Sequence, residues 1–163
     1  MKLSDGVEWA LHCCVVLRIA DCPTPASHLA EFHDVSPSYL AKHLQGLARA
    51  GIIRSIQGKG GGYVLGRPAN EISVLDVVEA VNGASPSFVC TEIRQRGPCQ
   101  TPPEKCVAPC GINAVMLAAD AAWRASLRGV TIADLASRGD KTANGDGTGA
   151  LAPAREWLAR ARD

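Results

Sequence analysis

The sequence has no apolar run of the roughly 18 residues that a membrane-spanning helix requires. Its first residues, MKLSDGVEW, also lack the apolar centre of a secretory signal peptide. These two absences argue against a membrane protein and against export. We therefore expect a soluble, cytoplasmic protein with no membrane partner.

Catalytic and nucleotide-binding motifs are absent as well. The stretch GKGGG at residues 58–62 lacks the Gly-Lys-Ser/Thr ending of a phosphate-binding loop, and it joins two strand-like runs. It therefore does not predict nucleotide binding. No catalytic constellation is visible elsewhere in the chain, so we do not expect an enzyme.

Acidic residues are missing between Asp34 and Glu71, although the whole chain has a net charge of only +1. The same window contains five basic residues: Lys42, Arg49, Arg54, Lys59 and Arg67. The positive charge of this near-neutral protein is thus concentrated in one segment, which is typical of a surface that binds nucleic acid.

Two short helices joined by a tight turn are predicted next to this segment. Thr24-Pro25 is typical of a helix start, and that helix runs through Phe32. Ser36-Pro37 repeats the signal and opens SPSYLAKHLQGLARAG, whose leucines share one face. The opposite face carries side chains that can contact phosphates or base edges: Ser38, Lys42, Gln45 and Arg49. The arrangement indicates a helix-turn-helix, although an ordinary solvated helix side would show the same pattern.

The residues that follow favour the DNA-binding interpretation. The runs IIRSIQ (52–57) and GYVLGR (62–67) are short and rich in β-forming residues, and the glycine-rich tip joins them into a hairpin. A hairpin directly after a recognition helix predicts a wing. The expected fold class is mainly α with a small β-hairpin, and we assign the winged helix-turn-helix to residues 1–83.

A first helix is predicted from Ser4 to Ala20 by apolar residues at helical spacing. Its other side carries large apolar residues among the polar ones, which makes it too apolar for an ordinary solvated face. The residues on this side are Asp5, Glu8, Trp9, His12, Val16 and Ile19. Either something else covers that side, or the helix is buried more deeply than usual in its own domain.

Seven cysteines are present, and four of them lie in a loop broken by proline and glycine: Cys90, Cys99, Cys106 and Cys110. An odd number of thiols in a reducing compartment argues against a disulfide framework and favours metal or redox use. The remaining three, Cys13, Cys14 and Cys22, are expected to be small core residues.

A long alanine-rich helix, GINAVMLAADAAWRASLRG, follows the cysteine loop. Ile112, Met116, Ala119 and Trp123 recur at roughly heptad spacing, which predicts a partner helix, most simply the same helix of a second copy. We assign residues 84–137 to the cysteine loop and dimerisation helix. Residues 138–152 are rich in glycine, aspartate, threonine and asparagine, so we predict that residues 138–163 are a flexible tail, with a marginal helix in the final PAREWLARARD.

These segments resemble the IscR/NsrR-type iron-sulfur transcription regulators. The resemblance covers about residues 1–136. It depends on the SPSYL helix start, the GKGGGYVLG wing, the ISVLDVVEAVNG helix and the cysteine loop before a long helix. It implies a homodimer that binds double-stranded operator DNA, a repressor whose affinity depends on a 2Fe-2S cluster and its redox state. Within the family the chain resembles most the redox-sensing RsrR type. The implied DNA-binding residues are Ser38, Tyr39, Lys42, Gln45, Arg49, Gln57 and Lys59.

The resemblance also implies which residues hold the cluster. Cys90 follows a helix closely and Cys110 stands at the start of the long helix, where a thiolate is favoured, so this outer pair is preferred to Cys99 and Cys106. Glu8 and His12 lie one turn apart on the first helix, and family members of this kind draw ligands from that helix of the other subunit. The implied metal ligands are Cys90 and Cys110 of one subunit with Glu8 and His12 of its partner.

Three alternatives stay open at this point. The spacing CX8CX6CX3C departs from the three closely spaced cysteines that family members often carry. The four cysteines could form a structural zinc site, although the usual Cys-x2-Cys pairs are absent, or Cys106 and Cys110 could form a thiol-disulfide switch. The cluster could also serve as a sensor of nitric oxide.

Gln57 stands where relatives can carry an arginine that enters the minor groove, so the operator sequence does not transfer.

Overall fold

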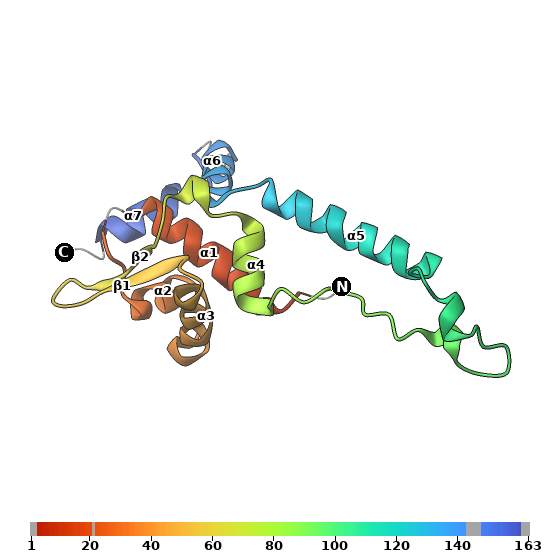
Figure 1. Ribbon diagram of the computed structural model, residues 1–163. Coiled ribbons are helices and arrows are strands. Elements are labelled where there is room, and N and C mark those ends of the chain that lie inside the picture. The colour runs from red at the N-terminus through yellow and green to blue at the C-terminus, as the bar shows by residue number, and fades with distance from the viewer. Residues whose placement is uncertain (1–2, 21, 143–147, 161–163) are drawn as a thin grey trace.

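The computed structural model describes residues 3–20, 22–142 and 148–160. Helices α1 (Asp5–Ile19), α2 (Ala26–Phe32) and α3 (Pro37–Arg49) precede a hairpin of β1 (Ile53–Ile56) and β2 (Gly62–Leu65). Helices α4 (Val74–Asn82), α5 (Gly111–Arg128), α6 (Ile132–Lys141) and α7 (Ala152–Arg160) follow, as Figure 1 shows. Three short 3-10 helices lie at Ala69–Glu71, Ile93–Gln95 and Pro103–Lys105. The predicted mainly α fold with one β-hairpin is confirmed.

The wing is an antiparallel pair in which Ile53 lies opposite Leu65 and Ile56 opposite Gly62. Its tip needs glycine, because Gly58 (φ 101°) and Gly60 (φ 79°) adopt left-handed backbone conformations. Thr24 adds a short bridge beside β2, since its N–H donates to the Tyr63 carbonyl at 3.0 Å and its carbonyl accepts from the Tyr63 N–H at 2.8 Å. The wing is thereby attached to the segment that leads into α2.

Hydroxyl side chains cap the starts of α3, α4 and α6, and of the two helix starts predicted at Thr24 and Ser36 only the one at Ser36 has its predicted cap. The Ser36 hydroxyl accepts a hydrogen bond from the Tyr39 N–H at 3.3 Å, and Ser73 forms a capping box with Asp76. Thr131 caps α6 in the same way. Thr24 does not cap α2, because its backbone is engaged with β2 and Pro25 takes the capping position instead.

The core is built around α1, which is buried on most of its circumference. Cys13 and Cys14 are fully buried there, as predicted, and burial raises the pKa of the Cys13 thiol to about 12. The same prediction is wrong for Cys22, which is exposed because it lies after the end of α1 and directly before Pro23.

The C-terminal region differs from the flexible tail expected over residues 138–163. Helix α6 continues to Lys141, and α7 buries Ala154 and Leu158 in the core. The Trp157 ring meets Phe32 edge to face with ring centroids 5.2 Å apart. Apolar residues at i, i+3 and i+4 thus find a partner surface in the domain. The parts of the expected tail at 143–147 and 161–163 lie outside the described residues.

Replacing Leu158 tests whether α7 belongs to the folded domain. Leu158 is 6% exposed, so Leu158→Ala should lower the free energy of unfolding. The expected loss is about 2–3 kcal/mol, the lower part of the range for buried leucine truncations. Glu156→Ala is the control, because its ion pair with Arg160 is exposed and 3.8 Å long and should contribute little. Equal unfolding midpoints for both variants in chemical denaturation would contradict the packing of α7.

Helix α5 leads away from the rest of the molecule, and the cysteine loop lies at its far end (Figure 1). The whole of α5 belongs to the described part of the chain, and none of its residues is buried. Near the domain, Arg124 pairs with Glu79 of α4, and along the helix the Ser87 hydroxyl donates to Asp120 at 2.8 Å. Over the described residues, no helix has the length and apolar character needed to cross a membrane.

Candidate DNA-binding surface and metal-ligand sites

Helix α3 separates an apolar face from a polar one. Leu40, Leu44 and Leu47 are fully buried, so the opposite face of the helix points to solvent. The residues predicted to meet DNA on this helix are all exposed: Ser38, Tyr39, Lys42, Gln45 and Arg49.

The wing extends this surface beyond α3. Gln57 and Lys59 lie in the exposed turn between β1 and β2. Of the five basic residues in the acid-free window, Arg67 is not available, because it forms an ion pair with Asp76 at 3.1 Å. Within the described part of the chain, the other four have no carboxylate partner within 4.0 Å: Lys42, Arg49, Arg54 and Lys59. The surface therefore keeps a local excess of positive charge that can meet phosphates.

Glu8 and His12 lie one turn apart on α1, as predicted from the sequence. Both residues are exposed. They border a groove of about 550 Å³ whose remaining wall is largely apolar and comes from α1, α2, α6 and the start of α7. Val16 and Ile19, on the same side of α1, are buried. This side of the helix is thus covered at one end by its own domain and open at the other.

His33 is a neighbour of this pair that no sequence pattern singled out. Its ring centroid lies 5.9 Å from that of His12 and 5.9 Å from that of Trp9. Burial first, and then the charge of His12, lowers the pKa of His33 to about 4, so its ring is neutral at neutral pH. Its Nε2 is buried with no hydrogen-bond partner among the described residues.

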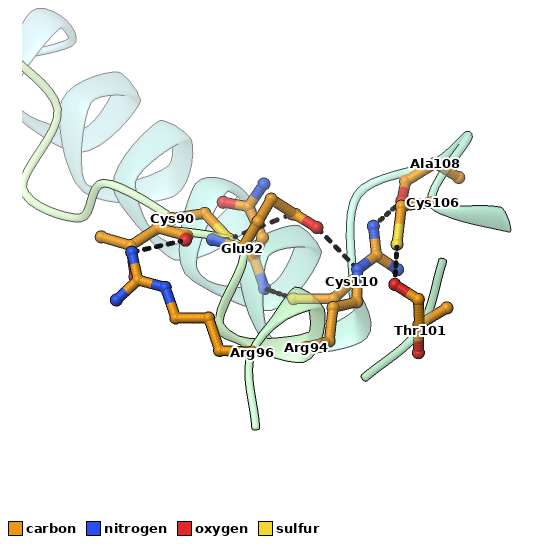
Figure 2. A network of polar contacts seen from close by, with 10 residues as sticks. Cys90, Glu92, Arg94, Arg96, Thr101, Cys106, Ala108 and Cys110 are labelled. Atoms are coloured by element: carbon orange, nitrogen blue, oxygen red, sulfur yellow. Dashed lines mark hydrogen bonds and ion pairs between the residues drawn. The ribbon is translucent and has the colours of Figure 1, made fainter. Parts of the chain in front are cut away.

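The cysteine loop is organised by Glu92 and Arg94 (Figure 2). The Cys90 thiol donates to Glu92 Oε1 at 3.3 Å, and the Glu92 N–H donates back to Cys90 Sγ at 3.4 Å. Arg94 donates to Glu92 Oε2 at 2.7 Å and to the Ala108 carbonyl at 2.5 Å, which ties the two ends of the loop together. Only the alternating charges of TEIRQR could have suggested this pair from the sequence.

Two of the loop cysteines are fixed by backbone donors. Cys110 caps α5, and its sulfur accepts from the Asn113 N–H at 3.4 Å, in agreement with its predicted place at a helix start. The Glu92 N–H lowers the pKa of the Cys90 thiol, but the Glu92 carboxylate, desolvation and the charge of Cys110 outweigh it, and the net direction is upward. The raised pKa favours the protonated Cys90 thiol, whereas a bound metal ion would favour the thiolate, which is the form that ligates metals. Cys99 is exposed, and Cys106 Sγ makes only a 3.9 Å contact with the Thr101 carbonyl.

The predicted ligands fall into two pairs that a single chain does not unite. Cys90 and Cys110 lie in the loop beyond α5, whereas Glu8 and His12 lie on α1 in the domain (Figure 1). Among the described residues of one chain, no group of three or more histidine, cysteine, aspartate or glutamate side chains is placed to hold a metal ion.

A winged helix-turn-helix with an exposed basic face, followed by a long uncovered helix, defines a DNA-binding transcription regulator. The chain belongs to the Rrf2 family, described as iron-dependent transcriptional regulators, whose model matches residues 3–138. Members of this class are regulators of transcription and not enzymes.

Particular relatives support this assignment. The chain is 38% identical over 107 residues to the protein aau3 of Rhizobium meliloti (strain 1021), covering 66% of each chain. It is 38% identical over 76 residues to the HTH-type transcriptional regulator IscR of Photobacterium profundum, covering 47% of this chain and 44% of that one. The matches thus span about half to two thirds of the length of these curated relatives.

Solved structures agree on the fold. CymR, the global cysteine regulator of B. subtilis, superposes with a TM-score of 0.66 and 26% identity, covering 86% of this chain and 99% of the other. IscR of T. potens superposes with a TM-score of 0.67 over 90% of this chain and 95% of the other, at 21% identity, which supports the fold alone. The resemblance to the IscR type is confirmed, and the finer likeness to the RsrR type stays a prediction.

Proposed function

We propose that this protein is a dimeric cytoplasmic repressor that binds operator DNA and senses redox state through a 2Fe-2S cluster. Cys90 and Cys110 of one subunit would hold the cluster with Glu8 and His12 of the partner. Residues 1–83 would bind DNA and residues 84–137 would form the dimer and the cysteine side of the cluster site.

The observation that carries this proposal is the separation of the two ligand pairs. Each pair lies on an open surface: Glu8 and His12 at the edge of a groove, Cys90 and Cys110 at the end of a helix without a buried residue. Helix α5 exposes Ile112 (68%), Val115 (68%) and Met116 (39%) on one face, an apolar surface that a second copy would cover. Because each cysteine loop lies far from its own domain (Figure 1), a dimer formed along α5 would let the loop meet Glu8 and His12 of the partner.

The donor set fits iron in a cluster better than structural zinc. Two thiolates, one imidazole and one carboxylate give an uneven ligand shell, whereas structural zinc is usually held in a closed tetrahedral site built from cysteine pairs at short spacing. Backbone donors hold the sulfurs of Cys90 and Cys110, and His33 packs beside His12, so the side chains around both halves of the site are already ordered. When bound, an iron-sulfur cluster supplies one-electron oxidation and reduction.

Cysteine substitutions test the ligand assignment. Cys90→Ala and Cys110→Ala should each lose most of the iron and acid-labile sulfide of anaerobically purified protein, because each removes a thiolate ligand. The double variant Cys99→Ala/Cys106→Ala is the matched control, since it removes thiols from the same loop, and it should keep the iron, the sulfide and the visible absorption. A colourless native protein that contains zinc would contradict the cluster.

A thiol switch is the second candidate. Cys106 and Cys110, the pair that the sequence offers for a switch, are both half-buried free thiols. CymR of Staphylococcus aureus, solved in an oxidised form, superposes with a TM-score of 0.62 at 27% identity. In that case DNA binding should change on thiol oxidation in protein free of iron, and either Cys106→Ala or Cys110→Ala should abolish the change.

Lysine substitutions test the proposed DNA-binding surface. Lys42 and Lys59 are exposed without a carboxylate partner in the described structure, so each is expected to meet a phosphate. Removing each should reduce the slope of log affinity against log salt concentration by about one unit. Lys141→Ala is the control, because Lys141 lies at the end of α6, outside the helix-turn-helix and wing. An unchanged slope in Lys42→Ala/Lys59→Ala would show that DNA binds elsewhere.

A further inference from the structure

Helices α1 and α3 meet at a contact that leaves no room for a side chain on α1. Gly6 is buried, and a Cβ atom built on it would lie 2.2 Å from His43 Cε1 and 2.6 Å from His43 Nδ1. Such separations are far below van der Waals contact. The imidazole of His43 therefore packs directly against the backbone of α1, two residues before Glu8.

The other side of the same ring supports a residue of the DNA-facing surface. The Tyr39 ring meets the His43 ring edge to face, with centroids 4.9 Å apart and planes at 73°. Tyr39 lies in the first turn of α3 beside Ser38, and 42% of its surface is exposed. One side chain thus touches both the helix that carries Glu8 and His12 and the exposed aromatic residue at the start of the recognition helix.

One ring nitrogen of the half-buried His43 also lacks, within the described part of the chain, the hydrogen bond that a buried polar atom normally makes. Its Nε2 is buried and has no partner among the described residues, which costs free energy unless the position has another use. Burial, followed by the charge of Lys42, lowers the pKa of His43 and so disfavours the charged form of the ring. A leucine would fill the same space at lower cost, but its branched side chain would not offer Tyr39 a flat ring.

We infer that His43 is a positioning residue for DNA recognition: wedged between Gly6 and Tyr39, it fixes the distance between α1 and α3 and holds Tyr39 toward the DNA. The inference rests on the proposed DNA-binding function. It also gives a physical route from the ligand-bearing helix to the DNA surface, because α1 cannot approach α3 near Glu8 without displacing His43 and with it Tyr39.

A double-mutant cycle tests this role. A high-affinity operator is first selected from random-sequence duplexes with the native protein. Affinity for that operator and for random-sequence DNA is then measured for Gly6→Ala, His43→Ala and the double variant, with circular dichroism as a check of folding. Gly129→Ala is the control, because Gly129 has an ordinary helical φ and a Cβ there would meet its nearest atom at 3.5 Å.

Gly6→Ala and His43→Ala should each lower operator affinity about tenfold, within the loss produced by one mismatched base pair. Affinity for random-sequence DNA should change much less, because phosphate contacts dominate it. The losses should not add, since His43→Ala removes the ring that the new methyl group would strike. A residue that only fills space would lower both affinities equally.

Native operator affinity in His43→Ala, additive losses in the double variant, or equal losses on both kinds of DNA would overturn the inference. If Gly6→Ala does not fold, the His43→Ala measurement decides alone. A native protein that selects no operator would instead contradict the proposed function, and the two failures are thereby distinguishable.

Discussion

A mixed dimer of one chain with Glu8→Ala and His12→Ala and a second chain with Cys90→Ala and Cys110→Ala is expected to contain one cluster instead of two. If ligands are shared between subunits, one site of this dimer combines the intact cysteines of the first chain with the intact Glu8 and His12 of the second. The other site has lost all four ligands. Iron and sulfide per dimer should therefore fall to half of the native value.

The parent homodimers make this result decisive. Each lacks half of the ligands at both sites and should hold almost no cluster, so mixing restores a site that neither parent has. Two different affinity tags isolate the mixed dimer. A His28→Ala/Glu31→Ala chain is the control for the first mutant, because it removes the same residue types from α2, and its homodimer should keep both clusters. Mixed dimers with no cluster would place all ligands in one chain, and mixed dimers with two would exclude these residues as ligands.

Replacing His12 by cysteine should lower the midpoint potential of the cluster by on the order of 100 mV. A thiolate adds negative charge where a neutral imidazole had none, and histidine-ligated Rieske centres lie several hundred millivolts above all-cysteine ferredoxins with two histidines exchanged. The value is measured by anaerobic potentiometric titration of the dimer.

Ser27→Cys is the control for that titration, since it adds a thiol at an exposed position of α2 with little change in size. Its potential should equal that of the native protein. If His12→Cys retains its cluster at the native potential, His12 is not a ligand and is only an exposed histidine of α1.

The sequence predicted those parts of the molecule whose causes are local. Ser36-Pro37 and the leucine spacing determine where α3 begins and which face it buries, and the glycines of the wing are required by its backbone angles. Glu8 and His12 share a face because a separation of four residues is only slightly more than one helical turn. Cys110 starts α5 because Pro109 and Gly111 bracket it.

Contacts between distant segments could not be predicted in this way. The packing of helix α7 was not predicted, because its apolar residues gain stability only on a surface that α1 and α2 create together. Arg67 was counted as a free cation, but its partner Asp76 lies outside the acid-free window. The neighbours of the ligand pairs, His33 and Arg94, carry no periodic or spacing signal, since their role comes from three-dimensional proximity.

The absence of buried residues along α5 bears on how DNA binding depends on the concentration of the protein in a cell. If α5 is covered by a second copy, as proposed, assembly is a bimolecular step, and the dimer concentration then rises with the square of the free chain concentration. A modest change in expression would then be amplified at the operator, independently of any signal. Partial degradation of the pool would, by the same mass action, lower operator occupancy more steeply than it lowers the amount of protein.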